Sequence, residues 1–188
     1  MTTTLLTGLM AAGAIGACAL AARMLARQAD PQRVAALGLV AGLAAFSCVV
    51  FAEPLQSATL FRVGVVLIGL GGGLFSVGTL SAAMQLESGG LHGMVLGAWG
   101  GVVATATGLS VALGGVLRDG GTHLAMSGAL GETLATPAAG YGFVYHLELA
   151  LLFVTLVVIG PLVRRRAPLA TRTDHLPPPR FGLADFPG

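Results

Sequence analysis

Residues 34–52 read VAALGLVAGLAAFSCVVFA, a stretch without a charged side chain. An α-helix rises about 1.5 Å per residue, so roughly 20 apolar residues cross the hydrocarbon core of a bilayer, which is about 30 Å thick. Asp30 and Pro31 come just before this stretch and predict the start of its helix, because Asp caps a helix and Pro fits the first turn. Four other stretches are similarly apolar, and the sequence predicts five spans at about residues 4–22, 34–52, 63–84, 94–117 and 141–163.

The composition of the whole chain agrees with this interpretation. The 188 residues are 55% hydrophobic and only 10% charged, with a mean hydropathy of +0.85, whereas a soluble domain carries roughly 25% charged residues. This shortage of charge excludes an ordinary water-soluble enzyme and a disordered chain. We expect an all-α, polytopic membrane protein, with a transmembrane helical domain at residues 1–166 and a proline-rich tail at residues 167–188.

The basic residues indicate which way the spans run. All ten are arginine, and two of them, Arg62 and Arg118, belong to one side of the predicted topology. The other eight lie in the first connection or after the fifth span, namely Arg23, Arg27, Arg33, Arg164, Arg165, Arg166, Arg172 and Arg180. Because arginine-rich loops stay in the cytoplasm, the sequence predicts a cytoplasmic C-terminus and a periplasmic N-terminus. An odd number of spans agrees with termini on opposite sides.

Small residues recur at four-residue spacing within two of the spans. The third span has Gly69 and Gly73, and the fourth has Gly93, Gly97 and Gly101. Positions four residues apart share one helix face, and a face of small residues lets a second helix approach closely within a membrane. We expect these glycines to pack against a helix of this chain or of a partner. The alternative is a pigment or lipid that rests on the bare backbone.

Polar residues of the fifth span are the candidate binding groups. Tyr141, Tyr145 and Glu148 share one helix face. An acid at mid-membrane depth costs of order 2.5–3.5 kcal/mol, so we expect Glu148 to face protein or a cavity, either for function or for a structural hydrogen bond. His146 follows Gly142 by one turn. This spacing lets a flat macrocycle lie against the helix while the imidazole ligates its central metal; the alternative is a local hydrogen bond near the helix end.

Other chemistry finds little support in the sequence. Cys18 and Cys48 lack metal-ligand spacing, and no basic face interleaved with aromatic residues indicates nucleic-acid binding. The chain has no paired aspartate motif that would hold magnesium and a diphosphate, and no motif of a zinc protease or a serine acylase. We therefore expect no catalytic residues and no metal site.

Several longer segments are similar to one known family. They are residues 71–80 (GGGLFSVGTL), 96–100 (LGAWG), 113–119 (LGGVLRD), 141–148 (YGFVYHLE) and 159–164 (IGPLVR). They resemble the PucC family, the light-harvesting complex assembly proteins of purple phototrophic bacteria, also called the BCH family, within the major facilitator superfamily. The resemblance runs from near Leu6 to the last residues. Family members have twelve spans and this chain resembles the last five, which implies part of the C-terminal half of a major facilitator fold.

The resemblance implies a non-catalytic protein of the bacterial inner, photosynthetic membrane that assists the assembly of antenna or reaction-centre complexes, or associates with them. Its implied partners are light-harvesting antenna polypeptides or the reaction-centre complex, the lipid membrane, and a missing N-terminal half or a second copy. Bacteriochlorophyll is the implied cofactor, with His146 and Gly142 as the residues that would meet it. The alternative function is a half-transporter of the major facilitator superfamily, which would need a separate N-terminal half because the cavity forms between two halves.

Overall fold

The computed structural model describes residues 3–85, 92–127, 131 and 139–164. These residues form α1 (Thr3–Ala26), α2 (Pro31–Ala52), α3 (Ala58–Met84), α4 (His92–Met126) and α5 (Ala139–Arg164), with no β-strand among them. All five helices are long and apolar enough to cross a membrane. The prediction of an all-α, multi-pass membrane protein with five spans is therefore confirmed. The predicted tail at residues 167–188 lies outside the described residues.

Capping side chains decide where two of the helices begin. Asp30 is the N-cap of α2, and its carboxylate accepts a hydrogen bond from the Gln32 backbone N–H at 3.1 Å, which confirms the predicted start of this helix. α3 begins at Ala58 and not near residue 63 as predicted, because the Ser57 hydroxyl accepts a hydrogen bond from the Leu60 N–H at 3.2 Å. A helix starts where its first N–H groups find an acceptor, whereas hydropathy marks only where the apolar residues begin.

α4 differs most from its predicted bounds. It continues to Met126, through residues expected to form a connection beyond Arg118. Tertiary packing is the reason, because a Cβ added at Gly121 would lie 3.4 Å from the Cα of Gly140 in α5. The Thr122 hydroxyl also donates a hydrogen bond to the Arg118 carbonyl oxygen at 2.9 Å, inside the same turns. Close backbone contact with α5 thus offsets the low helix propensity of the glycines here.

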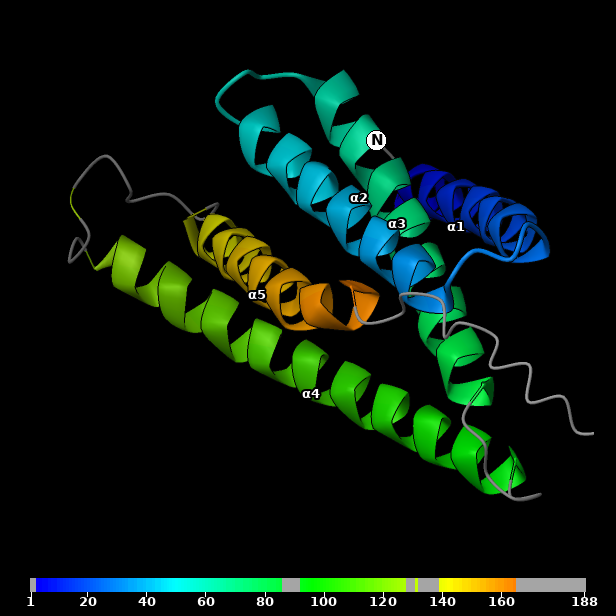
Figure 1. Cartoon of the computed structure of the whole chain (residues 1–188). Coiled ribbons are helices and arrows are strands. Elements are labelled where there is room, and N and C mark those ends of the chain that lie inside the picture. The colour runs from blue at the N-terminus through cyan, green and yellow to red at the C-terminus, as the bar shows by residue number, and fades with distance from the viewer. Residues whose placement is uncertain (1–2, 86–91, 128–130, 132–138, 165–188) are drawn as a thin grey trace, which may run out of the picture.

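The helices pack in an order different from their order in the chain (Figure 1). α3 lies between α1 and α2, α5 packs against α2, and α4 packs against α5. α1 and α3 run parallel, since an added Cβ at Gly69 would meet Met10 and one at Gly73 would meet Ala17. α2 is antiparallel to both α3 and α5. These directions alternate along the chain, as successive crossings of a membrane require.

The alternating directions give the bundle two chemically different ends. α1 and α3 finish at one end, where α2 begins and α5 finishes, and we call this the arginine-rich end because Arg27, Arg33 and Arg164 lie there. At the opposite end α2 finishes and α3 and α5 begin, and Arg62 and Arg118 belong to that end. The described arginines are thus divided between the ends as the sequence predicts. The cytoplasmic placement of the arginine-rich end stays a prediction.

Glycines let the backbones of α1, α2 and α3 touch. A Cβ added at Gly69 would collide with the Met10 carbonyl oxygen of α1, and one added at Gly38 of α2 would lie 2.7 Å from the Gly71 carbonyl oxygen of α3. The buried core beside these contacts consists of Ala17, Ala21, Val34 and Leu74. Close packing of this kind holds helices together within a membrane, where no hydrophobic driving force acts between them.

α4 is largely unpaired within the described chain. All residues from 101 to 113 are exposed, and Val111 keeps 72% of its accessible surface. A Cβ added at Gly93, Gly97 or Gly101 would meet nothing within 4 Å, so open space lies beside these three residues, which we call the α4 glycine face. The candidate span in α4 has 34 residues and would be about 51 Å long, so α4 must tilt or project beyond the hydrocarbon core.

The α4–α5 contact gives a first testable prediction. Gly140→Leu is expected to detach the start of α5 from α4, because an added Cβ would collide with the Arg118 carbonyl oxygen and the Thr122 hydroxyl. Overpacking of this kind costs about 1–3 kcal/mol, which a lower melting temperature of the detergent-purified protein would report. Gly120→Leu is the matched control, since nothing lies within 4 Å of that position. Equal destabilisation by both variants would contradict the contact.

Candidate functional site

A groove of about 440 Å³ opens at the end of the bundle opposite the arginine-rich end. It lies between the last turn of α2, the first turn of α3 and the first turns of α5. Its lining consists of Val49, Val50, Ala52, Glu53, Gln56, Ser57, Ala58, Phe61, Tyr141, Gly142, Tyr145 and His146. We call it the His146 groove. A concave site with mostly apolar walls and a few polar groups is typical of small-molecule binding.

The His146 imidazole is held in a defined hydrogen-bonding state. Its Nδ1 lies 2.7 Å from the carbonyl oxygen of Gly142, one turn earlier in α5. A carbonyl oxygen can only accept a hydrogen bond, so Nδ1 carries the proton and donates. In the neutral imidazole with its proton on Nδ1, the Nε2 atom keeps its lone pair, and this is the form in which imidazole ligates a metal. The local hydrogen bond and metal ligation, which the sequence poses as alternatives, are therefore compatible.

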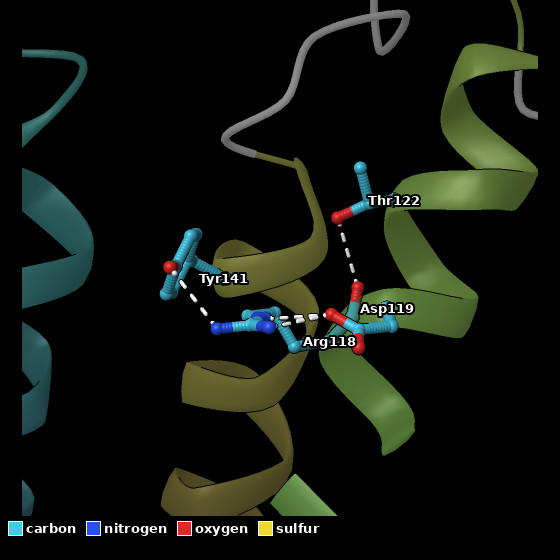
Figure 2. Close-up of polar contacts among 4 residues, drawn as sticks. All are labelled: Arg118, Asp119, Thr122 and Tyr141. Atoms are coloured by element: carbon cyan, nitrogen blue, oxygen red, sulfur yellow. Dashed lines mark hydrogen bonds and ion pairs between the residues drawn. The ribbon is translucent and has the colours of Figure 1, made fainter. Parts of the chain in front are cut away.

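A row of aromatic rings from α2 and α5 runs beside the groove, and Arg118 of α4 lies at its end. The ring centroids of Phe46 and Tyr145 are 6.2 Å apart, and those of Tyr145 and Tyr141 are 6.5 Å apart. The Arg118 guanidinium lies 5.5 Å from the Tyr141 ring centroid, and its Nη1 donates to the Tyr141 hydroxyl at 3.4 Å. Figure 2 shows Arg118 between Tyr141 and Asp119, whose carboxylate pairs with the guanidinium at 2.6 Å. Through the contact between Tyr141 and Arg118, this row connects the wall of the groove to α4.

The turn between α2 and α3 gives the groove a polar rim. Gln56 has a left-handed backbone with φ 47°, a conformation that costs a residue with a Cβ about 1–2 kcal/mol. Its side-chain amide donates to the Glu53 carbonyl oxygen at 2.9 Å. The Ser57 N–H closes α2 by donating to the Ala52 carbonyl oxygen at 3.0 Å. The rim therefore has a fixed conformation.

The structure brings together only some of the predicted site residues. Gly142, Tyr145 and His146 line the groove, whereas Glu148 is exposed and lies outside the lining. The glycines of the third span lie between α1 and α3, and the α4 glycine face is open. In the described part of the chain, no three His, Cys, Asp or Glu side chains lie close enough together to hold a metal ion.

The sequence did not predict that the polar rim residues Glu53, Gln56 and Ser57 belong to this site. They lie far from α5 in the chain, and no spacing links them to His146. The short polar connection between two apolar spans is the signal that could have found them, since such a connection must lie at a membrane surface next to other helix ends. Only the antiparallel packing of α2 and α5 shows which helix end is adjacent.

Comparison with known proteins shows which family the sequence of this chain matches. The family model described as PUCC protein matches residues 1–167. The chain is 45% identical over 185 residues to a Rhodobacter capsulatus protein named as an uncharacterized protein in the puhA-bchM intergenic region, covering 98% of this chain and 38% of that protein. It is 43% identical over 162 residues to protein PucC of Cereibacter sphaeroides, covering 86% of this chain and 34% of that protein.

The match covers only part of each relative. Protein PucC of Rhodovulum sulfidophilum is 46% identical over 117 residues, which cover 62% of this chain and 26% of that protein. The chain thus spans about a third of the length of the curated relatives it matches. No solved structure matches the chain.

Proposed function

Because the chain belongs to the PUCC protein family, we propose that it is a non-catalytic membrane protein that assists the assembly of photosynthetic light-harvesting complexes. The exposure of α4 over residues 101–113, with its open glycine face, carries this proposal. Such a helix is suited to dock another transmembrane helix. Small antenna polypeptides or helices of the reaction-centre complex are partners of that kind. The protein would act in the bacterial photosynthetic membrane, with its arginine-rich end in the cytoplasm.

The His146 groove would receive bacteriochlorophyll in this proposal. Nε2 of His146 would ligate the central magnesium. Gly142 leaves room beside the helix for a flat ring, since a Cβ added there meets nothing within 4 Å. Tyr145, which is half-buried, and Val49 supply wall surface for the ring to contact. The bound pigment would supply light absorption, and the chain would hold and orient it during transfer to antenna polypeptides.

Affinity purification from native membranes in a mild detergent tests this function. We expect antenna polypeptides to copurify, identified by mass spectrometry, together with bacteriochlorophyll absorbance. A colourless protein without any antenna or reaction-centre chain would overturn the proposal. Antenna chains without pigment would support the assembly role and remove the pigment role of the groove.

The α4 glycine face can be tested separately from folding. Gly101→Leu is expected to lower copurification of partner chains at least about fivefold, because a bulky side chain keeps a second helix at a distance. The melting temperature of the isolated protein should not change, since nothing in the described chain contacts this position. Ala106→Leu is the matched control, because it is also exposed but lies about 140° around the helix. Equal loss of partners with both variants would contradict docking on this face.

A second candidate function is one half of a two-part transporter. The observation that favours it is the exposure of α4 over residues 101–113. Facilitator-type transport needs a cavity between two halves, and the exposed α4 would then face the other half. Copurification of a polypeptide with about seven spans, in place of antenna chains, would support this candidate and contradict the first.

A further inference from the structure

A second cavity, of about 700 Å³, lies at the arginine-rich end and is separate from the His146 groove. It opens between the turn that joins α1 to α2 and the last turn of α3. Leu25 and Met84 form apolar parts of its wall, and Arg33, Ser81 and Gln85 are polar residues that line it. Because the helices are long enough to span the hydrocarbon core, a cavity at the level where they end would lie at the boundary between the hydrocarbon and the headgroups.

The connection that forms one wall of this cavity is rich in arginine. Arg33 lines the cavity and is exposed, and Arg27 lies in the same connection without lining it. Asp30, the one acid of residues 23–33, also lines the cavity, and as the N-cap of α2 its carboxylate accepts from the Gln32 N–H at 3.1 Å. Residues 23–33 carry three arginines and one acid, so this connection has a net positive charge, and Arg33 is the arginine that lines the cavity.

The turn that forms the cavity wall is held in a strained conformation. Gln28, which lines the cavity, has a left-handed backbone with φ 61°, a conformation that residues with a Cβ seldom adopt. The turn is fixed by a hydrogen bond from the Ala29 N–H to the Met24 carbonyl oxygen at 3.0 Å. Gln28 is thereby kept at the wall of the cavity, within which its side-chain amide is a further hydrogen-bond donor.

We propose that this cavity binds the phosphate headgroup of an anionic phospholipid. The planar guanidinium of Arg33 is suited to two parallel hydrogen bonds with phosphate oxygens, and the Gln28 amide and Ser81 hydroxyl are further donors. Leu25 and Met84 would contact the glycerol and the first methylenes of the acyl chains. Basic pockets between helices at the cytoplasmic surface bind acidic headgroups in this way. The proposal does not depend on the proposed function in complex assembly.

Lipid-dependent stabilisation of the purified full chain tests this site. The delipidated protein is titrated with phosphatidylglycerol or with phosphatidylcholine of the same acyl chains, and melting temperature and lipid retention in native mass spectrometry are recorded. We expect phosphatidylglycerol to bind at least about tenfold more tightly, and Arg33→Gln to remove most of this preference. Ser81→Trp should do the same without changing the charge, because the indole occupies the cavity.

The matched control is Arg27→Gln, which removes an arginine of the same connection that does not line the cavity. We expect it to keep most of the preference for phosphatidylglycerol. Equal loss with the two arginine variants would overturn the site in favour of diffuse surface charge, and equal stabilisation by both lipids would overturn it outright. Inorganic phosphate is the third arm of the titration. If it alone reproduces the stabilisation, the cavity is a free-phosphate site and the lipid assignment is wrong.

Discussion

Gly69→Leu is expected to destabilise the folded protein strongly. A Cβ at this position would collide with the Met10 carbonyl oxygen and lie 3.1 Å from the Ala14 nitrogen. Both are backbone atoms of α1, so no side-chain rotation relieves the collision and α1 must move away from α3. Overpacking costs about 1–3 kcal/mol and occasionally more. Since a whole helix interface is opened here, we expect about 3 kcal/mol, measured as the free energy of unfolding in mixed micelles titrated with sodium dodecyl sulfate.

The control for this prediction lies three residues further along the same helix. A Cβ added at Gly72 meets nothing within 4 Å, and the residue lines a shallow apolar groove between α1 and α3. Gly72→Leu should therefore change the free energy of unfolding by no more than about 0.5 kcal/mol. If both variants lower the free energy of unfolding by the same amount, the loss is a general effect of replacing glycine, and the α1–α3 contact is not its cause.

His146→Leu is expected to remove bound pigment from the protein purified out of native membranes. Leucine has no lone pair to ligate magnesium, while it leaves the apolar part of the groove in place. We expect bacteriochlorophyll absorbance per protein to fall at least about tenfold, which corresponds to about 1.4 kcal/mol of binding free energy. The ring is exposed and its one hydrogen bond is local, so the melting temperature should remain close to that of the unchanged chain.

Two further variants separate ligation from other effects at this site. His123→Leu removes a histidine in the last turn of α4 that does not line the groove, and it should leave the absorbance unchanged. Gly142→Leu keeps the imidazole but fills the space beside the helix, and it should lower the absorbance like His146→Leu. An unchanged spectrum in His146→Leu would remove this histidine from any role in pigment binding, whatever chains copurify.

The spans could be predicted from sequence because hydropathy and length act locally. Five apolar stretches must become helices in a bilayer, since every backbone N–H and C=O has to be paired within its own segment. The start of α2 could be predicted for the same reason, because the Asp30 side chain caps the helix through a hydrogen bond to a residue close to it in the sequence. The end of α4 could not be predicted, because it is determined by an interaction between residues far apart in the sequence. It depends on Gly121 lying against Gly140, a contact between two helices that no single stretch of sequence displays.

The candidate site could be predicted only in part for the same reason. His146, Gly142 and Tyr145 belong to one helix, so their helical spacing is enough to group them. Their neighbours across the groove, Glu53 and Gln56, join them only through the packing of α5 against α2. The separation of Glu148 from the groove also follows from which face of α5 meets its neighbours.

The amino-acid sequence alone makes this protein a bundle of five membrane-spanning helices whose arginines collect at one end, because burying apolar residues and excluding charge from lipid are properties of each segment. It also sets which helix faces carry glycine. Tertiary packing decides which of those glycines contact another helix of the chain. The glycines of α3 and α4 are chemically identical and differ only in whether a second helix lies beside them. Gly69 meets the backbone of α1, whereas Gly97 and Gly101 meet nothing. That difference is set by how the helices are paired, and it leaves α4 as the helix on which a partner can dock.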